Sequence, residues 1–197
     1  MIKNQKSVIS LIVICLLFCS VSLQAASFEK YAQKLLRFEG VGFGIDKPTW
    51  GNKDFTKAQA LKIHKEQFWN RYHGNLFESQ ALAEVFIDHL INAGEGKNSA
   101  NIKAFEAIVG AKQDGILSAD DIKKANNFIF PEQVVNIYVK YRILYYKSRK
   151  STVYQNGWIK RAMSFFVYSN AGNPLEFDEM GMPEELENMC KAYALMS

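Results

Sequence analysis

The 197-residue sequence contains few histidines and cysteines. Its three histidines, His64, His73 and His89, form no HExxH pair, and Cys15 and Cys19 both lie within the N-terminal residues 1–25. Structural zinc sites are built from such side chains at close spacing, so no metal site is expected. Each histidine is instead expected at a helix surface or in a half-buried position.

Motifs of common nucleophile and nucleotide sites are also absent. The sequence contains no GxSxG nucleophile elbow and no phosphate-binding loop. Gly40, Gly42 and Gly44 follow a helical pattern instead of a strand, which is the wrong context for a dinucleotide site. Cys190 lies on the apolar face of a C-terminal helical pattern, which favours packing over a nucleophilic role. No cofactor is therefore expected.

No apolar run is long enough to span a bilayer comfortably. The apolar stretch 8–18 follows Lys3 and Lys6 and leads to a cleavage-like ending, which is typical of a signal peptide over residues 1–25. The mature protein is expected to begin near Ala26, in the periplasm or outside the cell. No permanent membrane anchor is expected.

The charge of the mature chain is unevenly distributed. Residues 26–174 contain 21 basic and 14 acidic side chains, whereas the tail that follows carries six acids. A basic, exported body suits an anionic polymer such as the cell wall, a membrane surface or nucleic acid, although an ordinary soluble surface explains the same charge. The length of the mature chain predicts one domain over 26–170. Because Cys190 is the only cysteine of the mature chain, no internal disulfide is expected. The composition of residues 171–197 predicts an acidic tail with a helix.

Apolar residues recur at helical spacing along almost the whole mature sequence. The first pattern stops at Gly40, segments 56–59 and 118–121 have helix-capping sequences, and Pro131 fits the first turn of a long helix. No convincing strand pattern is present, apart from a small hairpin considered within 41–55. The sequence therefore predicts an all-α fold. The expected helices cover 28–38, 56–74, 82–94, 102–110, 118–125, 131–145, 158–168 and a last segment from 183.

Glu39 is the side chain most suggestive of chemistry. It falls where the first helix should end and a glycine-rich loop begins. The negative pole of the helix dipole disfavours ionisation there, so a raised pKa is expected for this carboxyl. General acid catalysis of glycoside hydrolysis needs such a group, with Asp46 or Asp54 as a second carboxylate and Trp50 as a stacking surface for a sugar. The alternative is an ordinary solvated helix end.

Phe38-Glu39-Gly40 and the loop that follows resemble the start of the peptidoglycan muramidases of glycoside hydrolase family 108. Segments 85–94, 110–117 and 156–161 resemble later parts of the same family, in the same order. The resemblance covers roughly 27–168, with 96–168 similar to the family's peptidoglycan-binding region. It implies a lysozyme-like helical fold, peptidoglycan as the partner instead of nucleic acid, and cleavage of the β-1,4 bond between N-acetylmuramic acid and N-acetylglucosamine.

The resemblance also implies roles for individual residues. Glu39 would be the general acid, Asp46 and Thr49 would supply the second carboxylate and a water or sugar contact, and Trp50 and Asn92 would bind substrate. Turn formation by Asp46 and Thr49, and helix capping by Asn92, are the alternatives. Three aromatic residues are expected in the core because of their helical spacing: Trp69, Tyr72 and Trp158.

The loop after Glu39 departs from the family pattern. It is shorter, and Val41 stands where the family has a second glycine. Because a displacement of about 1 Å can cost a factor of about 100 in rate, an inactive peptidoglycan-binding or scaffold protein is a second interpretation. A secreted antibacterial effector is a third. The acidic tail is a candidate docking element for an envelope protein, or a lid.

Overall fold

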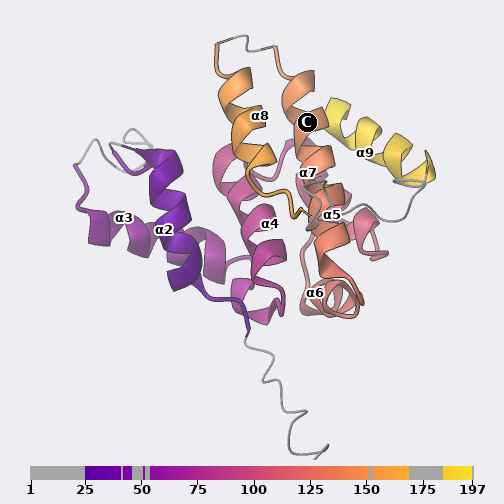
Figure 1. The fold of residues 1–197 in the computed structure, drawn as a ribbon, viewed down its shortest axis with the longest axis horizontal. Coiled ribbons are helices and arrows are strands. Elements are labelled where there is room, and N and C mark those ends of the chain that lie inside the picture. Colours follow the sequence, from indigo (N-terminus) through magenta and orange to yellow (C-terminus); the bar gives the residue numbers. More distant parts are fainter. Residues whose placement is uncertain are drawn as a thin grey trace, which may run out of the picture.

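The computed structural model describes residues 25–40, 42–45, 51, 54–150, 153–168 and 184–196. These residues are mainly helical and contain no strand, which confirms the expected all-α fold. None of the helices among them combines the length and apolar character needed to cross a membrane. The α-helices in Figure 1 are α2 (Phe28–Glu39), α3 (Lys57–His64), α4 (Gln80–Ala93), α5 (Ala100–Ile108), α6 (Ala119–Asn126), α7 (Pro131–Ser148), α8 (Gln155–Met163) and α9 (Glu184–Met196).

Local sequence chemistry sets several of the helix ends. Thr56 and Gln59 form a reciprocal capping box at the start of α3, and Ser118 and Asp121 do the same for α6. Each pair satisfies backbone N–H groups that have no partner inside the helix. Gly40 ends α2 with a φ of 56°, a conformation that glycine adopts at little cost. These predicted boundaries are correct.

The helix predicted for 158–168 is wrong in its second half, because α8 ends at Met163. The chain beyond it is held by α7 in a different way. Asn136 donates from its side-chain nitrogen to the carbonyl of Val167 at 2.9 Å and accepts from the Val167 N–H at 2.8 Å. This two-bond contact satisfies the backbone of Val167 without a helix. Most of the hairpin considered for 41–55 falls outside the described residues, and 42–45 form turns.

Helix α4 is the central element of the fold. Figure 1 shows it between α2 and the pair α7 and α8, which lie side by side. All eight residues from Leu82 to Leu90 other than Glu84 are less than 2 % exposed, and Phe86 packs against Phe105 and Tyr138. On the α2 side, Trp69 stacks on Tyr31 with ring centroids 6.0 Å apart. The core therefore brings both α2 and α8 beside α4, where Asp88 contacts Tyr31 and Arg161.

Helix α9 packs against α5 and α7. The carbonyl of Ala194 accepts hydrogen bonds from Ser148 at 2.8 Å and from Arg149 at 2.7 Å, both at the end of α7. Cys190 is completely buried beneath α9, and burial raises the pKa of its thiol to about 12. A thiol in this state is a packing group, as the sequence pattern indicated.

Candidate functional site

Glu39 is the last residue of α2, directly before the glycine that ends the helix. Its side chain is 14 % exposed, so most of it is enclosed by the protein. Oε1 accepts a hydrogen bond at 2.7 Å from Nη2 of Arg161, which lies on α8. This ion pair holds the Glu39 carboxyl at the end of α2.

Arg161 connects Glu39 to a second carboxylate, Asp88 on α4. Nη2 lies 2.9 Å from Oδ1 of Asp88 and Nε lies 3.0 Å from Oδ2, a two-pronged contact. The guanidinium also lies over the ring of Phe38, 4.7 Å from its centroid. Burial disfavours the charge of Arg161, but Asp88 and then Glu39 outweigh it and raise its pKa. Arg161 is therefore a fixed cation at the base of the site.

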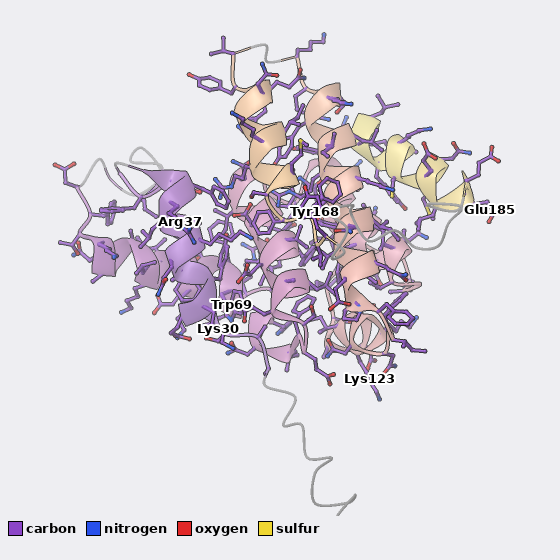
Figure 2. The ribbon with its side chains drawn as sticks, viewed as in Figure 1. Lys30, Arg37, Trp69, Lys123, Tyr168 and Glu185 are labelled. Atoms are coloured by element: carbon purple, nitrogen blue, oxygen red, sulfur yellow. The ribbon has the colours of Figure 1, made fainter. Side chains whose placement is uncertain are left out.

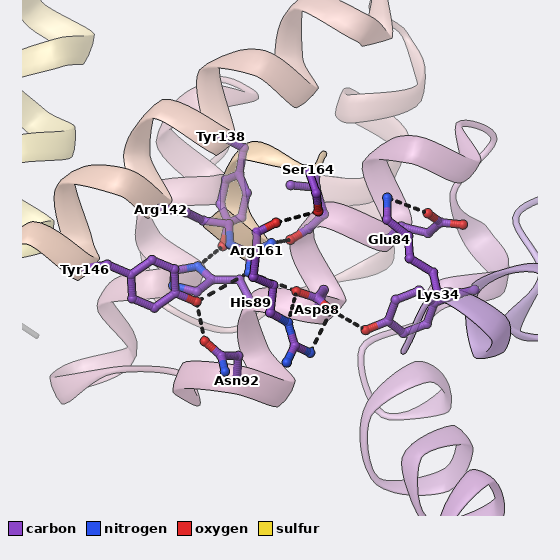
Figure 3. Close-up of polar contacts among 12 residues, drawn as sticks. Lys34, Glu84, Asp88, His89, Asn92, Tyr138, Arg142, Tyr146, Arg161 and Ser164 are labelled. Atoms are coloured by element: carbon purple, nitrogen blue, oxygen red, sulfur yellow. Dashed lines mark hydrogen bonds and ion pairs between the residues drawn. The ribbon is translucent and has the colours of Figure 1, made fainter. Parts of the chain in front are cut away.

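Asp88 is fully buried and is surrounded by donors (Figure 3). Besides Arg161 it accepts from Nη2 of Arg142 at 2.8 Å and from the hydroxyl of Tyr31 at 2.7 Å. Burial acts to raise the pKa of Asp88, but Arg142 and Arg161 together hold it below the ordinary value. Asp88 thus stays ionised and fully engaged, which makes it a structural anion and excludes it as a base or nucleophile.

A pocket of about 570 Å³ opens beside Glu39. Helix α2 contributes one wall, α4 a second and α8 the third, so the pocket depends on the packing of three segments far apart in the sequence. Charged, amide and aromatic side chains line it together. The lining residues are Phe38, Glu39, Asn92, Gly157, Trp158, Lys160 and Arg161.

The glycine-rich loop folds back onto Glu39. At Gly44, which has a φ of 67°, a Cβ atom would lie only 2.1 Å from Oε2 of Glu39. The preceding residue, Phe43, is tied to α3 through its carbonyl, which lies 2.8 Å from Nε2 of His64. Glycine is therefore required at position 44 so that the backbone can approach the carboxyl.

The structure places Asn92 in the pocket with Glu39. The Asn92 Oδ1 accepts a hydrogen bond of 2.6 Å from the hydroxyl of Tyr146, which itself accepts from Arg142. Figure 3 shows this chain of contacts running back to Asp88. The amide is thus held by the core instead of capping α4, and its N–H groups are the donors available to a ligand.

Asp54, the other candidate for the second carboxylate, is exposed and is not among the residues that line the pocket. The remaining predicted site residues are not placed. Asp46, Thr49 and Trp50 all lie outside the described residues, so their expected roles remain predictions. Among the three aromatic residues expected in the core, Trp69 and Tyr72 are buried. The expectation for Trp158 holds only in part: it is half-buried, packs against the core through Tyr146 on α7, and also lines the pocket.

The expectation for the histidines is wrong at two of three positions. His73 is exposed, but His64 and His89 are less than 2 % exposed. His89 lies among the rings of four tyrosines on α7 because it belongs to the apolar face of α4. Within the described ranges, no group of three or more histidine, cysteine or acidic side chains is arranged to hold a metal ion.

Sequence reasoning gave no role to Arg161 or Lys160, although both lie in the segment that resembles the muramidases. A signal for Arg161 was present, because Asp88 interrupts an apolar helix face and a buried carboxylate requires a cation. Comparison of the chain with protein-family models and with curated proteins gives no match. The resemblance to family 108 therefore remains an expectation.

Proposed function

We propose that the protein is an exported peptidoglycan hydrolase of the muramidase type, with Glu39 as its general acid. The observation that best supports this is the position of Glu39 at a helix end inside a pocket of about 570 Å³, with a polar and aromatic lining. Sugar-binding sites combine such aromatic and hydrogen-bonding groups. The signal-like N-terminus and the basic body agree with action on the cell wall.

The two oxygens of Glu39 are suited to different tasks. Oε1 accepts from Arg161 and can do so in either protonation state of the carboxyl. Oε2 is left to carry the proton. In the proposed reaction this proton passes to the glycosidic oxygen while the bond from that oxygen to the anomeric carbon breaks.

Arg161 favours the product of that proton transfer. When Glu39 loses its proton it becomes a carboxylate, and the guanidinium 2.7 Å away stabilises the new charge. Asp88 holds Arg161 through two bonds, so the cation does not depend on Glu39 for its position. Arg161 is therefore a positioning residue that also stabilises charge.

The remaining chemistry requires a group that activates water or captures the anomeric carbon. Asp88 is unsuited because three donors occupy its carboxylate. Asp46 remains the proposed second carboxylate, with Thr49 as the proposed water or sugar contact. Asn92 is the proposed donor to a substrate oxygen, and Trp50 a proposed stacking surface.

Digestion of purified peptidoglycan tests the reaction. The soluble products are reduced with borohydride and identified by mass spectrometry. A muramidase releases fragments whose new reducing end is N-acetylmuramic acid. Fragments ending in N-acetylglucosamine or cleaved only in the peptides would refute the proposed bond, and binding to sacculi without release would refute hydrolysis.

A further inference from the structure

We propose that the outward surface of α8 is a binding subsite for an anionic glycan strand and extends the Glu39 pocket along the helix. The term "α8 surface" here means Tyr154, Gly157, Trp158 and Lys160. The inference rests on the proposed function for the class of ligand, but it concerns binding and does not require that Glu39 be catalytic.

Two aromatic rings lead outward from the pocket. Trp158 lies in the pocket lining, and its ring packs against buried Tyr146 on the core side with centroids 5.7 Å apart. Tyr154, one helical turn earlier, packs against Trp158 at 6.1 Å and is 66 % exposed. An aromatic ring so exposed, supported from behind by a second ring, presents a rigid face for stacking on a pyranose.

The glycine between these rings leaves space for a ligand. Gly157 lies in the first turn of α8 and lines the pocket, yet a Cβ atom there would meet nothing within 4 Å. Glycine weakens a helix, and neither close packing nor a positive φ explains it at this position. Because Gly157 has no side chain, the space between the pocket and Tyr154 remains available to a ligand.

The positive charge around the α8 surface favours an anionic ligand. Residues 133–175 contain seven lysines and arginines and no aspartate or glutamate. Lys160 on the α8 surface is exposed, and Lys147 and Lys150 are exposed at the end of α7, which lies beside α8 in Figure 1. A sugar polymer that bears carboxylates, as peptidoglycan does on its muramic acids and stem peptides, matches both the aromatic face and the cations.

Binding measurements test the α8 surface without relying on catalysis. The protein carrying Glu39→Gln is the parent, and its affinity is measured for intact sacculi and for chitin, a neutral polymer with the same β-1,4 backbone. Tyr154→Ala and Gly157→Gln should each weaken binding to both polymers about tenfold. The first variant loses one stacking contact with a sugar, and the second fills the space beside the pocket with a side chain. Lys160→Gln should weaken binding to sacculi alone.

Matched substitutions control for general effects. Asn156→Gln changes an exposed neighbour on α8 outside the pocket lining. Lys123→Gln removes a cation from α6, which lies at the other end of α7 from the start of α8 (Figures 1 and 2). Both controls should bind like the parent, and every variant should keep the melting temperature of the parent or exceed it.

The outcomes separate this inference from the proposed function. Parental binding by Tyr154→Ala and Gly157→Gln, or no binding by the parent itself, would overturn the α8 subsite even if the wild-type protein cleaves peptidoglycan. Weakened binding by these variants, together with a wild-type protein that cleaves nothing, would support the subsite and refute the hydrolase. Equal losses for Lys160→Gln on sacculi and chitin would overturn the selection for an anion.

Discussion

Arg161 and Glu39 are separated by 122 positions in the sequence, and their side chains meet in an ion pair 2.7 Å long. The same Nη2 atom of Arg161 lies 2.9 Å from Asp88. One guanidinium therefore joins the end of α2 to the middle of α4 from its place on α8. This contact fixes the carboxyl of Glu39 at the pocket, and it links the stability of the fold to the geometry of the site.

Arg161→Ala should destabilise the protein by about 3 kcal/mol, because it leaves the buried carboxylate of Asp88 with one guanidinium instead of two. Urea unfolding measures this change. Arg71→Ala is the matched control: Arg71 pairs with Glu95 at 3.0 Å, but its side chain is 61 % exposed. The control should cost less than about 1 kcal/mol. Equal losses for the two variants would show that the buried network contributes no special stability.

Gly44→Ala should reduce hydrolysis of peptidoglycan strongly, because the new methyl group would displace the Glu39 carboxyl. A loss of about 100-fold is expected from a shift of about 1 Å. Gly42→Ala provides the comparison, since Gly42 also has a positive φ, of 94°, but a Cβ atom there meets nothing within 4 Å. Both substitutions strain the backbone, because both positions have a positive φ, but only Gly44→Ala places an atom against Glu39. A difference in rate between the two variants therefore reports the contact with Glu39. Similar rates for the two would contradict the proposed contact.

His89 should make the protein less stable as the pH falls. Burial, assisted by the charge of Arg142, lowers the pKa of His89 well below 6.5, and the side chain lies among four tyrosines. Below about pH 6.5 the unfolded chain binds a proton at this residue and the folded chain does not. The free energy of unfolding is therefore undiminished by His89 above that pH, and it falls below that pH by up to about 1.4 kcal/mol per pH unit.

Urea unfolding between about pH 7 and pH 5 measures this slope, above the range in which ordinary carboxylates titrate. His89→Phe keeps an aromatic ring of similar shape but cannot titrate, so its slope should be much flatter. Its stability at neutral pH will fall as well, because the Nδ1 contact with Tyr138 at 3.1 Å is lost, and only the slope decides. His73→Gln, at an exposed position, should keep the slope of the wild type. An unchanged slope in His89→Phe would assign the effect to another group.

The end of α2 at Glu39 was predictable because it depends on the residues around it. Gly40 stops the helix, and the caps at Thr56 and Ser118 start later ones through bonds that span three residues. Such interactions are encoded within a few positions. The helical fold and the location of Glu39 therefore followed from the sequence.

The partners of Glu39 were not predictable in the same way. Arg161 reaches it only because α2 and α8 both pack beside α4, and helical spacing carries no information on which distant helices meet. Trp158 illustrates the same limit, since apolar spacing on α8 is equally compatible with a core residue and with a pocket wall. The buried carboxylate of Asp88 was the best available sign that a cation had to come from elsewhere in the chain.

The measurement that tests the central claim most directly is the rate of peptidoglycan hydrolysis by Glu39→Gln compared with the wild type. Glutamine keeps an oxygen that can accept from Arg161, but its amide has no acidic proton to transfer to the glycosidic oxygen. The rate should fall by a factor of about 100 or more, while binding to sacculi and the melting temperature stay close to wild type. Hydrolysis by Glu39→Gln at the wild-type rate would contradict the assignment of Glu39 as the general acid.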